Sequence, residues 1–125
     1  MSGTYTIVLP WKRPLLSMND RKHWAQKAKL TRQIRDTTCL LARGLPRGLD
    51  RIEITLHYRP IDNRRRDEDN LTPVLKACAD GVVDAGVVAD DTPQYMTKHM
   101  SVIHTADKGR PASMWLTITI PEDRP

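Results

Sequence analysis

The sequence predicts a single small α/β domain, residues 1–125, with a mixed sheet and two main helices in the order β-α-β-α-β-β. Three segments alternate apolar and polar residues, as half-buried strands do. Two longer segments between them repeat apolar residues at helical spacing. The length of 125 residues and the hydrophobic content of 39% suit one core.

The first half of the chain predicts one strand and one long helix. Residues 4–10, TYTIVLP, are β-branched and alternating, so they predict a strand that its proline ends. A helix is expected from about Asp20 to Ala42, with Asn19 or Asp20 as its cap. The expected core stripe of the helix is Leu30, Ile34 and Leu41.

The second half predicts a strand, a helix and two further strands. Residues 51–58, RIEITLHY, alternate and stop near Pro60. Thr72 is a good cap, Pro73 suits the first helical position, and Gly86 suits the helix end. Residues 94–104 and 113–120 read as two strands joined by a polar turn. The expected apolar stripe of this second helix is Leu75, Cys78, Ala79, Val82 and Val83.

Composition narrows the class of protein. No apolar run approaches the roughly 18 residues of a membrane helix, and no charged-then-apolar leader opens the chain, so we expect a soluble cytoplasmic protein. Cys39 and Cys78 lack the paired spacing of a zinc site, so we expect reduced thiols in the core.

Charge is distributed unevenly along the chain. Residues 1–66 hold 15 Lys and Arg against 5 Asp and Glu, which gives +10. Residues 67–125 hold 5 against 10, which gives −5 and leaves the net +5 of the whole chain. This asymmetry favours a basic surface that binds the phosphate backbone of a nucleic acid. Beside it would lie an acidic site whose charge is neutralised by a cation from outside the chain.

The acidic site is expected to include the run RRRDEDN, residues 64–70. On extended backbone Asp67 and Asp69 would point to the same side, whereas in a helix they would diverge by about 200°. Two such carboxylates repel each other, and oxygen ligands select Mg²⁺ or Mn²⁺. Asp90 and Asp91 follow the second helix, and the loop after that helix could bring them back to Asp67 and Asp69. Lys76 lies in the first turn of the same helix.

Each of these features has a simpler interpretation. Most paired loop acids are hydrated, the Asp90–Asp91 pair suits a turn, and a first-turn lysine is commonly solvated. A calcium loop is excluded because Thr72 and Cys78 stand where a glycine and a bidentate glutamate are needed. The histidines show no metal-ligand spacing, and no Ser/His/Asp triad or glycine-rich phosphate loop is present.

The combined pattern RRRDEDNL…LKACADGVVDAGVVADD resembles the signature of the RusA family of Holliday-junction resolvases. The similarity is dense over residues 64–91 and sparse but ordered elsewhere, where TIVLP and MNDRKHW resemble the N-terminal region of the family. In this chain six residues separate Asp69 from Lys76, three more than in the family pattern, and Pro73 resets the helix start. Gly81 stands where alanine is usual, which would weaken a helix.

The resemblance implies a RusA-like α/β homodimer of phage or prophage type, acting in a bacterial cell or phage-infected host in DNA recombination and repair. It would resolve four-way DNA junctions by paired, Mg²⁺-dependent symmetric nicks, and Mn²⁺ could substitute. Asp80 falls on the pattern without an assigned role. The metal-holding catalytic carboxylates would be Asp67, Asp69 and Asp91, with Asp90 as a further ligand and Lys76 as the catalytic lysine.

DNA contacts are expected from the basic residues near these acids. We expect phosphate contacts from Arg64, Arg65, Arg66, Arg21 and Lys22, and a positioning role for Asn70. Trp24 could contact DNA together with Arg21 and Lys22, but a tryptophan on an amphipathic helix is more often in the core, which is where we expect it. Three alternatives remain open: a nuclease for forks, flaps or other branched DNA, a DNA-binding homologue without catalysis, and a protein-interaction domain whose acidic loop keeps it soluble.

Overall fold

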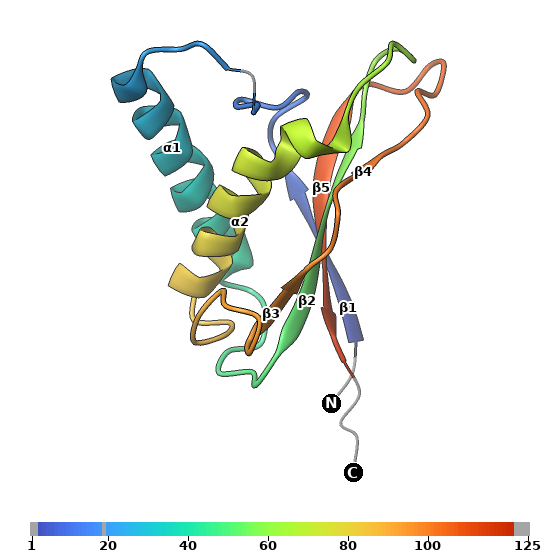
Figure 1. Ribbon diagram of the computed structural model, residues 1–125. Coiled ribbons are helices and arrows are strands. Elements are labelled where there is room, and N and C mark those ends of the chain that lie inside the picture. The colour runs from blue at the N-terminus through green and yellow to red at the C-terminus, as the bar shows by residue number, and fades with distance from the viewer. Residues whose placement is uncertain (1–2, 19, 122–125) are drawn as a thin grey trace.

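A computed structural model of the chain describes residues 3–18 and 20–121 (Figure 1). Its elements are β1 (Gly3–Leu9), α1 (Trp24–Ala42), β2 (Ile52–Arg59), the 3₁₀ helix η1 (Glu68–Leu71), α2 (Thr72–Asp84), β3 (Met96–Lys98), β4 (Val102–Ile103) and β5 (Ser113–Ile120). Within these described ranges, no helix combines the length and the apolar character that spanning a bilayer requires.

The sheet is mixed, as expected. β5 lies between β1 and β2 and is antiparallel to both, so β1 and β2 run in the same direction. β3 and β4 pair in parallel with successive parts of β2 along its other edge. The single strand expected over residues 94–104 is instead two short strands, because one extra residue shifts the register between the pair Ile54–Lys98 and the pair His57–Val102. α1 and α2 each connect strands of the same direction.

Both helices cover one face of the sheet (Figure 1). The alternation of β2 and β5 places every second side chain on that face, where the chain buries its core. The buried side chains of these two strands are Ile52, Ile54, Leu56, Tyr58, Met114, Leu116, Ile118 and Ile120. α2 adds the expected Leu75, Cys78, Ala79 and Val82, while Val83 is partly buried.

The start of α1 differs from the expectation. The helix begins at Trp24 instead of about Asp20, and the Nδ1 atom of His23 accepts the cap hydrogen bond from the backbone N–H of Ala25, at 3.2 Å. Asp20 instead accepts from the backbone N–H of Lys22, at 3.0 Å, in the turn before the helix. The alternative cap, Asn19, lies outside the described residues.

The buried face of α1 also differs. Ile34 is fully buried and Leu30 packs against the core, as expected, but Leu41 is 41% exposed. Thr38 is fully buried, one turn after Ile34. Trp24, expected in the core, is 75% exposed. The helix is mostly polar, so its apolar pattern was too weak to fix which side faces inward.

α1 and α2 touch at a glycine. A Cβ atom on Gly81 would lie 2.4 Å from the carbonyl oxygen of Arg35 and 2.8 Å from the Cβ atom of Thr38, both on α1. Beside this point Arg35 donates two hydrogen bonds to the carboxylate of Asp84, at 2.6 and 2.8 Å. Gly81 is therefore the residue that allows the close approach of the two helices.

Both cysteines are free thiols, as expected. The Sγ atom of Cys78 accepts a hydrogen bond from the hydroxyl of Thr38, at 3.6 Å. Burial raises the pKa of the Cys78 thiol to about 12, so this sulfur is a packing group and not a nucleophile.

The face of the sheet opposite the helices carries a ring cluster. The rings of His57 and Trp115 stack at 5.2 Å between centroids. The Nδ1 atom of His57 lies 2.9 Å from the Nε2 atom of His104, and its Nε2 atom lies 2.9 Å from the hydroxyl of Thr117. His57 is thus a half-buried strand residue whose two ring nitrogens both have hydrogen-bond partners.

Candidate functional site

Two clefts flank the short helix η1. The first, here called the lysine cleft, has a volume of about 380 Å³ and is lined by Glu68, Asp69, Thr72, Leu75, Lys76, Lys98, His99, Met100 and Ser101. The second, here called the arginine cleft, has a volume of about 350 Å³ and is lined by Arg13, Pro14, Ser17, Tyr58, Arg64, Arg65, Arg66, Asp67, Asn70, Leu71 and Ile103. Of the sequence-predicted site residues, Asp69 and Lys76 line the lysine cleft, and Asp67, Asn70 and the three consecutive arginines line the arginine cleft.

The two acids of the DxD pair do not share a side. The two carboxylates would share a side only on extended backbone, and this condition is not met because Asp67 alone is extended and η1 begins at Glu68. Asp67 is the N-cap of η1, and its Oδ1 atom accepts a hydrogen bond from the backbone N–H of Asp69, at 3.0 Å. As a result Asp69 lines the lysine cleft while Asp67 lines the arginine cleft.

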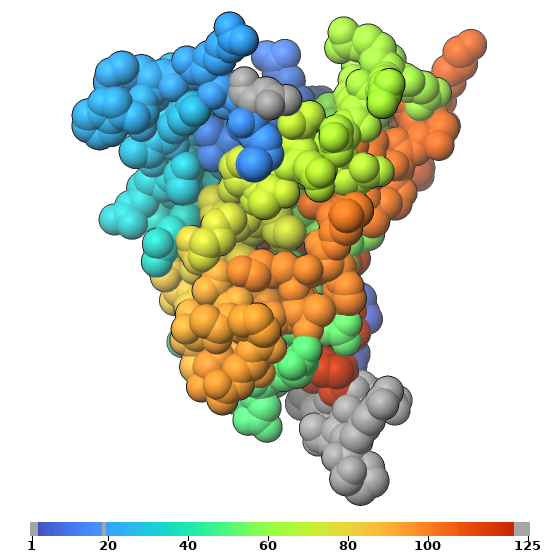
Figure 2. All heavy atoms as spheres, viewed as in Figure 1, coloured from blue at the N-terminus to red at the C-terminus, as the bar shows by residue number. Residues whose placement is uncertain are grey.

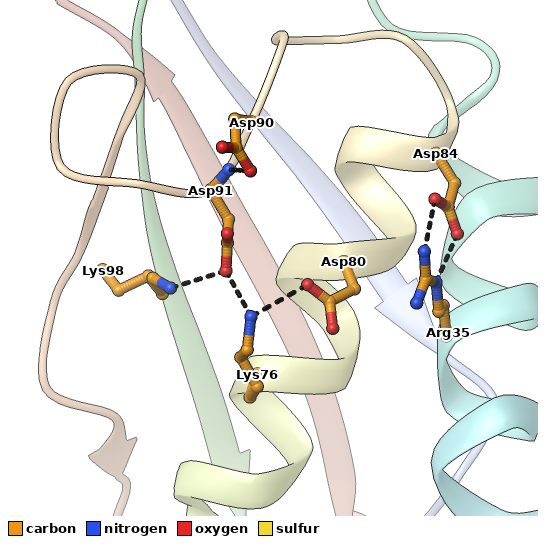
Figure 3. Close-up of polar contacts among 7 residues, drawn as sticks. All are labelled: Arg35, Lys76, Asp80, Asp84, Asp90, Asp91 and Lys98. Atoms are coloured by element: carbon orange, nitrogen blue, oxygen red, sulfur yellow. Dashed lines mark hydrogen bonds and ion pairs between the residues drawn. The ribbon is translucent and has the colours of Figure 1, made fainter.

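The structure brings Asp91 to Lys76 from a distant part of the chain. The loop after α2 returns along the helix, and Figure 2 shows this amber and orange segment lying against α2. The Nζ atom of Lys76 donates to the Oδ2 atom of Asp91 at 2.6 Å and to the Oδ1 atom of Asp80 at 3.1 Å (Figure 3). Asp80, which had no assigned role, thus holds Lys76 one turn along α2.

Lys98 was not identified from the sequence. It is the last residue of β3, and its Nζ atom donates to the same Oδ2 atom of Asp91 at 2.9 Å (Figure 3). No local motif marks this lysine, because its place depends on the parallel register of β3 with β2, in which Lys98 pairs with Ile54. Asp91 therefore lies between two ammonium groups.

These contacts set the charge of the cluster. The side chain of Asp91 is only 15% exposed, and hydrogen bonds from Lys76 and then Lys98 hold its pKa well below the usual range of a carboxyl group. Asp91 and Asp80, in that order, raise the pKa of Lys76. At neutral pH the Asp91 carboxylate is therefore ionised and the Lys76 amine is protonated.

Asp90 is placed differently from its neighbour. It is exposed, and its Oδ1 atom accepts a hydrogen bond from the backbone N–H of Asp91, at 2.8 Å. This contact is the turn chemistry that the sequence allowed, and it orients the loop that carries Asp91.

The three consecutive arginines have distinct environments. Arg66 donates to the backbone oxygen and the carboxylate of Asp62, at 2.8 and 2.9 Å, and its guanidinium lies over the ring of Tyr58. Arg64 also contacts Asp62, at 3.2 Å, but its side chain is 80% exposed. Arg65 is exposed and has no ion-pair partner among residues 3–18 and 20–121, so it is available to a phosphate.

The other expected DNA contacts are mixed. Asn70 lines the arginine cleft, and its backbone N–H donates to the backbone oxygen of Asp67, at 3.1 Å. Arg21 and Lys22 are exposed residues before α1 and line neither cleft. Lys22 is paired with the carboxylate of Asp20, at 2.8 Å. Arg13, which the sequence did not single out, lines the arginine cleft.

The aspartates of the candidate site suit Mg²⁺ better than a softer metal. Asp69, Asp80, Asp90 and Asp91 offer carboxylate oxygens only. In the part of the chain that the structure describes, no three His, Cys, Asp or Glu side chains are close enough together to hold an ion. The chemistry of the donors therefore fits, while the two lysines occupy the carboxylate of Asp91.

Comparison with known proteins adds one relative. No model of a known protein family matches the chain. The chain is 30% identical over 86 residues to an uncharacterized protein of Xylella fastidiosa (strain Temecula1 / ATCC 700964). The match covers 64% of this chain and 56% of that protein, so this chain spans little more than half of its relative's length.

Proposed function

We propose that the chain is a Mg²⁺-dependent endodeoxyribonuclease that cuts four-way DNA junctions, as its resemblance to the RusA family implies. The observation that carries the proposal is the meeting of Lys76 and Asp91, at 2.6 Å, beside the cleft that Asp69 lines. These three residues come from η1, from the first half of α2 and from the loop after α2. Such convergence from distant segments is typical of an active site.

The carboxylates and the lysine have distinct parts in the proposed reaction. Asp69 and Asp91 would hold Mg²⁺, with Asp90 as a further ligand, and the bound ion would supply an activated water and neutralise charge on the leaving oxygen. Asp67, which caps η1 and lines the other cleft, would not reach this ion. Lys76 would contact the phosphate at the N-terminal end of α2, whose backbone N–H groups also favour an anion. Asp80 would keep Lys76 in that position.

The arginine cleft supports the choice of a nucleic acid as substrate. It lies on the other side of η1 and is lined by Arg13, Arg64, Arg65 and Arg66. A DNA backbone that crosses η1 would meet these arginines beside the cut strand. Phosphate contacts of this kind position the DNA without recognising its sequence. Two copies related by a two-fold axis would present two such sites, which matches a junction with two equivalent strands.

Cleavage of defined DNA substrates tests the proposal. The purified chain is incubated with a labelled four-way junction, a fork and a linear duplex of matched sequence, with Mg²⁺ or with chelator. We expect symmetric nicks in the junction that require Mg²⁺, and no cutting of the duplex. Equal cutting of fork and junction would favour a broader branched-DNA nuclease, and a failure to cut any substrate would contradict the proposal.

A second candidate is a DNA-binding homologue without catalysis. The observation that favours it is the pairing of Asp91 with two lysines, together with the lack of a three-ligand cluster among the described residues. Such a protein would bind the junction with the salt dependence of phosphate contacts and leave it intact in Mg²⁺. Binding and cleavage measured on the same sample separate the two candidates.

A further inference from the structure

Asp91 receives two ammonium groups on a single oxygen atom. Its Oδ2 atom accepts from Lys76 at 2.6 Å and from Lys98 at 2.9 Å (Figure 3). A cation that uses this oxygen must compete with both lysines. The carboxylate of Asp91 is therefore already paired with two ammonium groups before any metal ion arrives.

The two lysines are not equivalent. Lys76 also contacts a second carboxylate, that of Asp80, and would keep this contact if its contact with Asp91 were lost. Lys98 contacts one carboxylate, Asp91, among the described residues, and it ends a strand of three residues at the sheet edge. Lys98 is therefore the lysine that can leave.

A phosphate bound in the lysine cleft could replace Asp91 as the partner of Lys98. Lys98 lines this cleft together with His99 and Ser101 on one side and with Thr72 and Lys76 on the other. Thr72, Ser101 and the two lysines can donate a hydrogen bond to a phosphate oxygen, whereas the Nε2 atom of His99 already lies 2.6 Å from a carboxylate oxygen of Glu53. A phosphate in the cleft would thus offer Lys98 an anionic partner in place of Asp91.

Charge makes the exchange favourable. Lys76, Lys98, Asp80 and Asp91 together are neutral, so the cluster attracts a divalent cation only weakly. When Lys98 pairs with a phosphate instead, the remaining three groups carry a net charge of −1, which favours a cation.

We propose that Lys98 couples phosphate binding to metal binding by moving from Asp91 to a DNA phosphate in the lysine cleft. The coupling makes the two bindings cooperative in both directions. It keeps the site low in affinity for metal until DNA is present. This inference rests on the proposed function in that Asp91 is taken as a metal ligand and DNA as the polyanion.

Metal affinity of the free protein gives the first test. Mn²⁺ binding is measured by electron paramagnetic resonance without DNA for the parent chain and for Lys98→Gln, with Lys98→Arg retaining the charge. We expect Lys98→Gln to bind Mn²⁺ about tenfold more tightly, and Lys98→Arg to remain as weak as the parent. Lys29→Gln, an exposed change on α1 with the same charge loss, should have no effect.

Junction affinity in chelator gives the second test, as a double-mutant cycle. Asp91→Asn releases Lys98 and should tighten junction binding about fivefold in the parent chain. In the Lys98→Gln background the same change should tighten binding by about twofold or less. General electrostatics alone would give an equal gain in both backgrounds. Circular dichroism and thermal unfolding check that each variant is folded.

The outcomes separate this inference from the proposed function. Equal Mn²⁺ affinity in the parent chain and in Lys98→Gln, or an equal Asp91→Asn gain in both backgrounds, overturns the coupling and leaves the nuclease proposal standing. If no variant binds Mn²⁺, and Mn²⁺ at the same concentrations supports no junction cleavage, both the coupling and the nuclease proposal are overturned.

Discussion

The contact between α1 and α2 makes Gly81→Ala an informative perturbation. An alanine Cβ would lie 2.4 Å from the carbonyl oxygen of Arg35, 2.8 Å from the Cβ atom of Thr38 and 3.0 Å from the backbone nitrogen of Cys39. Two of these three atoms are helix backbone and cannot rotate away. Because ordinary contacts of carbon need roughly 3.5 Å, the helices must separate by about 1 Å.

The expected loss follows from two opposing effects. Alanine gains about 1 kcal/mol over glycine in a helix interior. Against this, forcing an extra methyl group into a packed contact costs about 1–3 kcal/mol or more. The separation also strains the hydrogen bonds between Arg35 and Asp84. With the steric cost at the upper end of its range, about 3 kcal/mol, and the gain of about 1 kcal/mol set against it, we expect a net loss of about 2 kcal/mol, equivalent to a fall of about 8 °C in Tm.

Urea unfolding followed by circular dichroism measures this loss. Gly44→Ala is the matched control, because Gly44 is exposed and an added Cβ there would meet no atom within 4 Å. It should be neutral or slightly stabilising. If Gly81→Ala is as stable as the parent chain, with an unchanged denaturant slope, the close packing of the two helices at Gly81 is refuted.

Three further predictions concern the arginines and the histidine pair. Arg65→Ala should lower the slope of log affinity against log salt for junction binding by about one, while Arg66→Ala should chiefly lower the free energy of unfolding because Asp62 and the ring of Tyr58 hold Arg66. Equal effects of the two variants on both quantities would contradict this division. Burial and then the charge of His104 lower the pKa of His57, so the folded state takes up its proton less readily than the unfolded chain. Stability should therefore be steady above about pH 6.5 and fall as the pH drops below it, in urea unfolding across pH 5–8. His57→Gln should flatten this fall, and an equally steep fall in the variant would show that another group is responsible.

Much of the sheet and of α2 could be predicted because each depends on local pattern. The strict alternation of residues 51–58 and 113–120 fixed the buried face of β2 and β5. Pro73 and an apolar stripe located α2 to within one or two residues. The order of the strands could not be predicted, since it depends on which edges pair after the chain folds.

The errors occur where polar contacts override pattern. Asp67 caps η1 and turns the chain, so the extended DxD geometry did not form. In α1 the inward position went to Thr38 instead of Leu41, because the helix must present a small side chain to Gly81. Gly81 itself was interpreted as a cost to helix stability, although its lack of a Cβ is what allows the helices to meet.

The candidate site was predictable in part for the same reason. Motif spacing identified Lys76 and Asp91, and the structure places them in contact. Lys98 could not be predicted from the sequence, because its contact with Asp91 depends on the register of β3 against β2. No sequence pattern of one chain encodes a pairing of that kind.

The most direct measurement of the proposed chemistry is the single-turnover rate of junction cleavage by Asp69→Asn in Mg²⁺, with junction affinity measured in chelator. Asp69 lines the lysine cleft, and its side chain makes no hydrogen bond or ion pair with any of the residues that the structure describes, so the amide should preserve the fold. We expect affinity within about twofold of the parent and a cleavage rate lower by about 100-fold or more. Asp107→Asn, an exposed change of equal charge, should cut at the parental rate. Cleavage by Asp69→Asn at that same parental rate would contradict the assignment of the carboxylates.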